Sequence, residues 1–209
     1  MIFNFSKKYQ FTTKLNINDV NIEIPRETKL LGTVITDKLT WERNTEEIVK
    51  KGYRRMQLLH AAANFTSSKR DLKDLNVTFI RSVLEQSAVV WHSSLKNKNR
   101  GDIERVQKAA VRVIMGNSYK TYKDSLRVLK LDSLERRREK LCLQFAKICT
   151  THEKLKDIFP LNKTKHKMTL RNQKKYKSLK ANTKRYKQSG LPYMTKLLND
   201  EFTKKSMFL

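Results

Sequence analysis

The chain has 209 residues, with 46 Lys and Arg against 20 Asp and Glu, and its formal net charge is therefore +26. Because an excess of this size repels itself in a folded chain, it favours a polyanionic partner, most often nucleic acid and less often an anionic membrane surface. No run approaches the roughly 18 apolar residues of a transmembrane helix, and the 5 Gly, 3 Pro and 38% hydrophobic residues predict a mostly helical chain of one domain or one and a half.

The first structured segment is expected between residues 10 and 36. Five aliphatic residues nearly alternate around the turn-forming pair Asn18-Asp19 and predict a β-hairpin: Leu15, Ile17, Val20, Ile22 and Ile24. Pro25 ends the second strand, and a third extended piece is expected from Leu30 to Ile35. Three short strands do not bury a sheet face by themselves, so either the following helices cover that face or a partner does.

The first helix is expected to begin near Thr40 or Asn44, since Asn44 and Glu47 fit a capping box with Asn44 as N-cap. One stripe at helical spacing is predicted to face the core: Val49, Tyr53, Met56 and Leu59. Four cations lie on the other side: Lys50, Lys51, Arg54 and Arg55. This pattern is expected of a helix that packs one face on a core and binds an anion with the other. A basic face that is only solvated, without a partner, has the same pattern.

A second helix is predicted from Ser68, as N-cap, to about Trp91. Its apolar stripe comprises Leu72, Leu75, Phe79, Val83, Val90 and Trp91. Because Trp41 and Trp91 each stand at one end of an apolar stripe, both indole rings are predicted to be largely buried.

A third helix is predicted after Gly101-Asp102, ending at Gly116-Asn117. It is expected to bury Ile103, Val106, Ala110 and Val113. Three cations fall on its other side at positions i, i+3 and i+7: Arg105, Lys108 and Arg112. A short helix around residues 122 to 129 follows.

A further capping box, Asp132 to Glu135, opens a helix whose apolar residues are Leu134, Leu141, Phe145 and Ile148. Its first turn contains Arg136, Arg137 and Arg138, and positive charge there opposes the helix macrodipole, which is a weak sign of an outside partner.

Cys142 and Cys149 lie on one face of this helix, about 10 Å apart along the axis, too far for a disulfide. They indicate reduced core thiols of an intracellular protein. The four histidines lack the spacing of a metal-ligand pair: His60, His92, His152 and His166.

The composition shifts between Lys163 and Lys187, where eleven of 25 residues are Lys or Arg and none is Asp or Glu. Such a block is expected to be mobile when free. Its two tyrosines, Tyr176 and Tyr186, together with the cations suit single-stranded or structured RNA, while a basic linker with incidental tyrosines is the alternative. A last helix follows Ser189 to Pro192, and its Met194, Leu197 and Leu198 are expected to dock on the bundle.

Four stretches, in order, resemble the region that follows the catalytic core of non-LTR retrotransposon reverse transcriptases, the type with an endonuclease in front. They are TKLLGTVITDKLTWERN, IRSVLEQSAVVWHSSLKNKNRGDIERVQKAAVRVI, YKDSLRVLKLDSLERRREKLCLQFAKI and TKRYKQSGLPYMTKLLN. The resemblance runs from about residue 10 to residue 202. Asn44 stands where the family usually has His, and Gln86 where it has Tyr.

The resemblance divides the chain into residues 1–38, the edge of the palm, residues 39–152, a thumb-like helical region, and residues 153–209, a basic tail with a terminal helix. The fold class expected is mainly α: a helical bundle with a small N-terminal antiparallel β element and a basic, partly flexible C-terminal segment. The family polymerises with metal-binding carboxylates in an aromatic-x-Asp-Asp hairpin. This chain has no adjacent Asp pair and no endonuclease set of Asp, Asn and His. The resemblance therefore implies a non-catalytic carboxyl-terminal fragment without a cofactor of its own, since Mg²⁺ would belong to the palm.

The partners expected are RNA, DNA or an RNA–DNA hybrid, held by contacts to on the order of six to ten phosphates, with no membrane and no small-molecule substrate. Two other hypotheses stay open: a host protein that has kept this bundle for RNA or DNA binding, and one piece of a split reverse transcriptase beside a separate palm-containing chain. The residues expected to bind nucleic acid are Lys50, Lys51, Arg54, Arg55, Arg105, Lys108, Arg112, Arg136, Arg137, Arg138, Arg171, Lys174, Lys175, Tyr176, Lys184, Arg185 and Tyr186.

Overall fold

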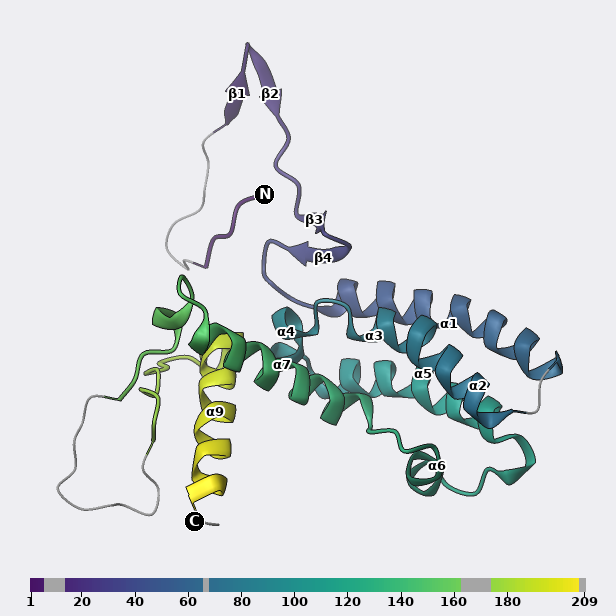
Figure 1. Cartoon of the computed structure of the whole chain (residues 1–209). Coiled ribbons are helices and arrows are strands. Elements are labelled where there is room, and N and C mark those ends of the chain that lie inside the picture. The colour runs from purple at the N-terminus through teal and green to yellow at the C-terminus, as the bar shows by residue number, and fades with distance from the viewer. Residues whose placement is uncertain (6–13, 66–67, 163–173, 207–209) are drawn as a thin grey trace. The chain divides into compact units, whose positions relative to one another are not determined.

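A computed structural model describes residues 1–5, 14–65, 68–162 and 174–206 of the chain (Figure 1). It is 64% helical, so the predicted mainly α fold with a small N-terminal antiparallel β element is confirmed. The chain forms two compact units. Unit 1 comprises Met1–Gln86 and Asn97–Ser125, and unit 2 comprises Ser87–Lys96 and Leu126–Leu209. The division of the sequence at residues 38 and 152 stays a prediction, because these units are defined by contacts and interleave along the chain.

The first hairpin of unit 1 is the predicted one. Strand β1 (Leu15–Ile17) pairs antiparallel with β2 (Val20–Ile22), and Asn18 and Asp19 turn the chain with positive φ angles of 48° and 62°. The pairs Leu15–Ile22 and Ile17–Val20 lie two positions apart, so these four aliphatic side chains share one face of the hairpin. All four are exposed.

A second hairpin replaces the single extended piece predicted from Leu30 to Ile35. Strand β3 (Glu27–Leu30) pairs with β4 (Thr33–Thr36). The prediction was wrong because Leu31 and Gly32 both have positive φ, 47° and 82°, and reverse the chain between the strands. Gly32 is also needed for space, since a Cβ there would lie 2.5 Å from Nε2 of Gln86.

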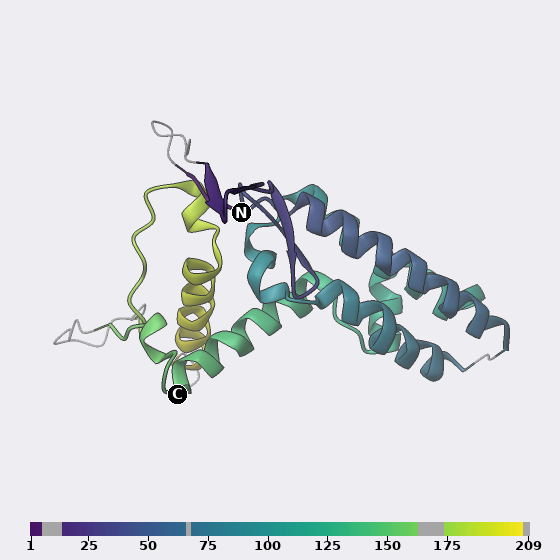
Figure 2. The ribbon, with the colours of Figure 1, turned by 90° about the horizontal axis from the view of Figure 1, so that it is seen from above.

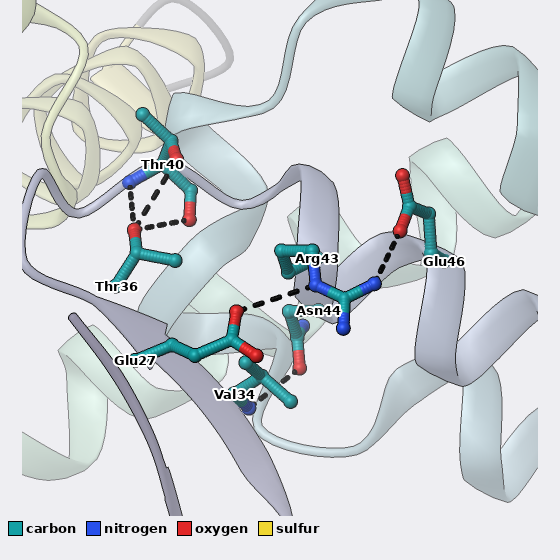
Figure 3. Close-up of polar contacts among 7 residues, drawn as sticks. All are labelled: Glu27, Val34, Thr36, Thr40, Arg43, Asn44 and Glu46. Carbon is teal, nitrogen blue, oxygen red and sulfur yellow. Dashed lines mark hydrogen bonds and ion pairs between the residues drawn. The ribbon is translucent and has the colours of Figure 1, made fainter. Parts of the chain in front are cut away.

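Polar side chains attach this second hairpin to helix α1 (Glu42–Phe65) (Figure 3). The Asn44 amide oxygen accepts a hydrogen bond from the Val34 N–H at 3.1 Å, and the Thr36 hydroxyl accepts one from the Thr40 N–H at 2.9 Å. Asn44 is therefore not the N-cap that the sequence predicted. It lies inside the first turn of α1, where its side chain satisfies a strand N–H that faces away from β3.

The buried face of α1 differs from the predicted stripe. Ile48, Gly52, Met56 and Leu59 are buried, whereas Tyr53 is 42% exposed. Gly52 lies at the centre of this face. Because glycine has no side chain, it is not counted in a hydrophobic stripe and the pattern does not reveal it. A Cβ at Gly52 would lie 3.0 Å from Leu84 and 3.1 Å from Val106, so the missing side chain is what lets α1 approach its neighbours.

The second predicted helix begins as expected and then breaks. Ser68 caps α2 (Lys69–Leu75) by accepting a hydrogen bond from the Asp71 N–H at 3.3 Å. A π-helical segment, η1 (Asn76–Arg81), and α3 (Ser82–Glu85) continue it. Helix α4 (Ala88–Trp91) belongs to unit 2 and is separated from α3 by Gln86 and Ser87, and the φ of Ser87 is +52°.

The π-helical segment explains the errors in the predicted stripe of this helix. Its wider turn shifts the helical phase by one residue, so Ile80, Val83 and Leu84 are buried while Phe79 is 48% exposed. Beyond the break, Val90 is 51% exposed and Trp91 is fully buried. The predicted burial of Trp41 and Trp91 is confirmed, at 7% and 0% exposure.

Helix α5 (Asn97–Met115) starts earlier than predicted and ends at the predicted glycine, since Gly116 has a φ of +50°. It buries Ile103, Val106 and Ala110 as expected, while Val113 is half-buried. A 3-10 turn, η3 (Gly116–Ser118), and α6 (Tyr122–Leu129) follow. The predicted bounds of α6 are confirmed.

Unit 2 is built on α7 (Leu134–Thr151), with the short segments η2 (His92–Ser94), η4 (Lys156–Ile158) and α8 (Lys184–Lys187) and the last helix, α9 (Gly190–Ser206). The N-cap of α7 is Ser133, which accepts a hydrogen bond from the Arg136 N–H at 3.3 Å, and not Asp132 as predicted. Phe145 and Ile148 are exposed by 40% and 53%, contrary to the predicted stripe.

The core of unit 2 forms between α7 and α9, which run close to each other in both views (Figures 1 and 2). Cys142, Ala146 and Cys149 of α7 belong to the same cluster as Met194 and Leu198 of α9. Both cysteines are free and buried, as predicted. The docking of the last helix is also as predicted, since Leu197 packs against this cluster.

Candidate nucleic-acid interface

The four predicted cations of α1 do not form one uniform face. Lys50, Arg54 and Arg55 are exposed and Lys51 is half-buried. Helical geometry places Lys50 and Arg54 about 160° around the helix from the buried Gly52, while Lys51 and Arg55 lie on the flank. We call Lys50 and Arg54 the α1 ridge, because they are the members of the set that point most directly away from the core.

Arg55 has a partner inside unit 1. Its guanidinium donates a hydrogen bond to the Phe79 carbonyl oxygen of the π-helical segment and lies 3.4 Å from the Ser82 hydroxyl. The side chain therefore joins α1 to η1. A phosphate would compete with these contacts, so Arg55 is a weaker candidate than the α1 ridge.

Arg43 lies on the same side of α1 as the ridge but is neutralised by two carboxylates (Figure 3). Its guanidinium lies 3.3 Å from Glu27 of β3 and 2.9 Å from Glu46, one turn further along α1. These two hydrogen-bonded carboxylates raise the pKa of Arg43. Its charge is thus compensated within the chain, in contrast to Lys50 and Arg54.

The three predicted cations of α5 are exposed and share one side of that helix. We call Arg105, Lys108 and Arg112 the α5 ridge. Arg105 is paired with Asp102 at 2.9 Å. The other two lie against aromatic rings: the Lys108 Nζ is 5.4 Å from the ring centroid of Tyr122, and the Arg112 Cζ is 5.4 Å from that of Tyr119.

The two ridges face opposite ways. Gly52 of α1 packs against Val106 of α5, and each ridge lies more than about 100° around its own helix from that contact. The predicted phosphate-binding residues of unit 1 therefore lie on two separate sides of the α1–α5 pair.

The Arg136–Arg138 run of α7 is divided by helical geometry. Arg136 and Arg137 are exposed. Arg138 is fully buried, because it lies four residues before Cys142 on the core face. Its Nε donates to Nδ1 of His92 at 3.4 Å, and its Cζ lies 5.7 Å from the Trp91 ring centroid. The prediction that Arg138 binds nucleic acid was wrong.

The buried contacts of Arg138 extend to α9. The Nε2 of His92 lies 3.4 Å from the Tyr193 hydroxyl, and the two rings meet edge-on with centroids 5.8 Å apart. Arg138, His92 and Tyr193 thus join α7, η2 and α9 inside unit 2. On the exposed side, Asp132 is paired with both Arg136 and Lys140, at 3.6 and 2.5 Å.

Of the tail residues predicted to bind nucleic acid, the structure places five at the surface and one in the core. Lys174, Lys175, Lys184, Arg185 and Tyr186 are exposed. Arg171, and the predicted mobility of residues 163–173, fall outside the described residues.

Tyr176 is buried at 9% exposure and belongs to the core cluster of unit 2. Its N–H donates to the Asn199 amide oxygen at 2.9 Å, and its carbonyl oxygen accepts from the Asn199 amide nitrogen at 3.1 Å. Tyr176 therefore fixes the tail to α9, and the prediction that it stacks on bases was wrong.

The sequence prediction missed two tyrosines beside the α5 ridge. The Tyr122 hydroxyl donates to the Glu104 carboxylate and accepts from the Gln107 amide nitrogen at 2.8 Å. Burial, followed by the hydrogen bond to Glu104, raises the pKa of Tyr122. The stretch SYKTYK, from Ser118 to Lys123, alternates rings and cations, and that pattern was available as a signal.

The part of the chain that the structure describes contains no group of three or more His, Cys, Asp or Glu side chains placed to hold a metal ion. No helix within the described ranges combines the length and the apolar character needed to span a membrane.

The sequence matches no protein-family model, and no curated protein or solved structure matches it.

Proposed function

We propose that this chain binds nucleic acid through the sugar–phosphate backbone, as the carboxyl-terminal thumb region of the non-LTR retrotransposon reverse transcriptases that its sequence resembles. The observation that supports this most is the pair of exposed cationic ridges on α1 and α5, in a chain whose net charge is +26. A globular core has no need for such an excess, whereas a polyanion compensates it.

The side chains of the two ridges are of the kind that binds phosphates. Lys50, Lys108 and their arginine neighbours carry charge without a fixed base-reading geometry, and contacts of this kind hold a duplex in place without reading its sequence. Because the ridges face opposite ways, one straight duplex meets one ridge at a time. Each ridge therefore supplies only part of the total affinity.

The proposal gives this chain no share in phosphodiester chemistry. A polymerase of the resembled family needs paired carboxylates that hold two metal ions, and this sequence contains no adjacent Asp pair. In the proposed role the chain positions nucleic acid, and Mg²⁺ and the reacting groups belong to the palm.

Fluorescence anisotropy with labelled RNA, DNA and hybrid duplexes tests the proposal. The variant Lys50→Gln/Arg54→Gln and the variant Arg105→Gln/Lys108→Gln/Arg112→Gln should each weaken binding, and the five substitutions together should weaken it by about tenfold or more at low salt. The matched control is Arg43→Gln on α1, which should change the affinity by less than about twofold because Glu27 and Glu46 already compensate its charge. Affinity that survives all five substitutions would contradict the proposal.

A second candidate function is favoured by the first hairpin. Leu15, Ile17, Val20 and Ile22 share one face of a two-stranded sheet and are all exposed, and a lone hairpin of this size is marginal in water. We propose, as this alternative, that the face packs on a separate palm-containing chain in a split reverse transcriptase. DNA synthesis by such a palm should then rise when this chain is added, and Ile17→Asp/Val20→Asp should remove the gain without changing nucleic-acid affinity.

A further inference from the structure

The surface between the end of α5 and the start of α6 combines cations with aromatic rings. Arg112 and Lys108 are exposed, and each lies against a tyrosine ring that is only half-buried. Tyr119 and Tyr122 are thus neither ordinary core residues nor freely moving surface side chains. They come from SYKTYK, where the neighbouring Lys120 and Lys123 are also exposed.

Hydrogen bonds hold this surface in one arrangement. The Tyr122 hydroxyl is fixed between Glu104 and Gln107. The Lys69 Nζ donates to the Ser118 hydroxyl at 2.9 Å, which ties α2 to the segment before Tyr119. The Thr121 hydroxyl bonds both the N–H and the carboxylate of Asp124, at 3.2 and 2.6 Å, and so caps α6. Because the groups are already ordered, a ligand would lose little free energy in ordering them.

The acidic groups of this surface are engaged within the protein. Asp102 is paired with Arg105 at 2.9 Å, Glu104 accepts from Tyr122, and Asp124 accepts from Thr121. Against these three carboxylates stand five further cations: Lys69, Lys108, Arg112, Lys120 and Lys123. The surface is therefore positively charged and includes two half-buried tyrosine rings, over which Lys108 and Arg112 lie.

We infer that this α5–α6 surface is a site for unpaired nucleotides of single-stranded RNA or DNA. A planar guanidinium against a tyrosine ring forms a flat platform on which a base stacks, and the lysines around it meet the flanking phosphates. The inference rests on the proposed function, in which the ligand is nucleic acid. It adds that this surface binds the single-stranded form. A duplex hides its base faces, so it gains only the phosphate contacts here.

Two nucleic-acid probes distinguish base stacking on the tyrosine rings from electrostatic binding of the phosphates. The first is a short single strand that contains the fluorescent adenine analogue 2-aminopurine, whose emission falls when it stacks on an aromatic ring. The second is the same strand annealed to its complement. Intact protein should quench the single strand. Tyr119→Leu should abolish the quenching and weaken single-strand binding by about tenfold, while duplex affinity stays within about twofold. Tyr119→Phe should behave as the intact protein.

A third variant tests the guanidinium. Arg112→Lys keeps the charge that Arg112 contributes to the α5 ridge but loses the planar group, so it should lower quenching and single-strand affinity by clearly more than it lowers duplex affinity. Trp41 fluorescence and far-ultraviolet circular dichroism verify that unit 1 of each variant is folded. If Tyr119→Leu does not fold, Arg112→Lys decides alone.

The outcomes distinguish this inference from the proposed function. If intact protein binds both probes and neither Tyr119→Leu nor Arg112→Lys changes single-strand binding, the stacking site is refuted and backbone binding stands. Equal losses on single strand and duplex would refute it too, because Tyr119 would then act only through the fold. If intact protein binds neither probe, the proposed function fails and this site fails with it.

Discussion

The two units of the chain use their positive charge differently. Unit 2 is the more basic, with twenty-four Lys and Arg against seven Asp and Glu, compared with twenty-two against thirteen in unit 1. Yet unit 2 buries Arg138 and Tyr176, two of the residues predicted to bind nucleic acid, whereas unit 1 exposes the ridges on α1 and α5. Charge density therefore predicts poorly which cations are exposed, and the phase of each helix relative to its core predicts it better.

Arg138 shows why the difference matters. An arginine stays protonated at any ordinary pH, so its burial in unit 2 depends on groups that accept its hydrogen bonds or face its charge. His92 and the Trp91 ring are two of these. In unit 1, Lys108 and Arg112 of the α5 ridge lie over tyrosine rings and are exposed, so a ligand can reach them. The same residue type is thus buried in one unit and exposed in the other.

The largest expected effect concerns the buried cation of unit 2. Arg138→Ala removes a fully buried side chain and leaves His92 without this contact, so unit 2 should lose about 3 kcal/mol of unfolding free energy. The neighbouring exposed Arg137→Ala is the control and should change it by less than about 0.5 kcal/mol. Urea unfolding followed by Trp91 fluorescence, in a Trp41→Phe background, measures unit 2 separately. Equal effects of the two substitutions would show that Arg138 is not structural.

The next effect concerns the close helix contact of unit 1. Gly52→Leu forces a side chain between α1, Leu84 and Val106, where even a Cβ would be 3.0 and 3.1 Å from its neighbours. Overpacking of this kind should cost about 2 kcal/mol, measured by Trp41 fluorescence in a Trp91→Phe background. Gly101→Ala in α5 is the matched control. A Cβ there meets nothing within 4 Å, so this change should stabilise unit 1 by about 0.5–1 kcal/mol.

A smaller effect should appear at high pH in unit 2. Burial raises the pKa of Cys142 from 9.0 to about 11, and it raises the pKa of Cys149 as well. The folded state therefore favours the neutral thiols. The contribution of these thiols to the unfolding free energy is complete below the pKa that they have in the unfolded chain. It is lost as the pH rises through about 11.

The loss for Cys142 is at most about 2.7 kcal/mol, since each pKa unit corresponds to about 1.36 kcal/mol, and it is smaller at any pH below about 11. Unfolding free energies measured from pH 8 upward test this, with Cys142→Ala as the variant that should lack the larger part of the fall. An unchanged pH profile in Cys142→Ala would contradict the assignment to this thiol.

Local signals made much of the fold predictable. Asn18-Asp19 specifies a two-residue turn and Gly116 a helix end through their backbone angles, and Ser68 specifies a helix start through the hydrogen bond that its hydroxyl accepts. The heptad-like spacing of Arg105, Lys108 and Arg112 likewise placed the α5 ridge correctly, because α5 is a regular helix with a strong apolar face.

The errors arose where tertiary contacts override local pattern. Gly52 lies at the centre of the buried face of α1 because two neighbouring helices pack closely against it. A glycine does not contribute to a hydrophobic stripe, so the pattern could not predict this. The π-helical segment changes the phase after Asn76. Arg138 and Tyr176 are buried because His92 and Asn199, distant in the sequence, bind their polar groups. The contacts of Tyr119 and Tyr122 with Arg112 and Lys108 could not be predicted from the SYKTYK pattern, because these two cations lie on α5.

The most direct test of the central claim, that the exposed ridges bind phosphates, is the salt dependence of nucleic-acid affinity. Each phosphate neutralised on a duplex contributes a slope of about −0.9 to log K against log salt. The intact chain should give a slope of about −4 or steeper between about 50 and about 200 mM salt, and substituting all five ridge residues with Gln should flatten it by about 2–3 units, because a duplex meets one ridge at a time. The slope should be the same for unrelated duplex sequences. A slope near −1 for the intact chain, or one that the five substitutions leave unchanged, would contradict the account.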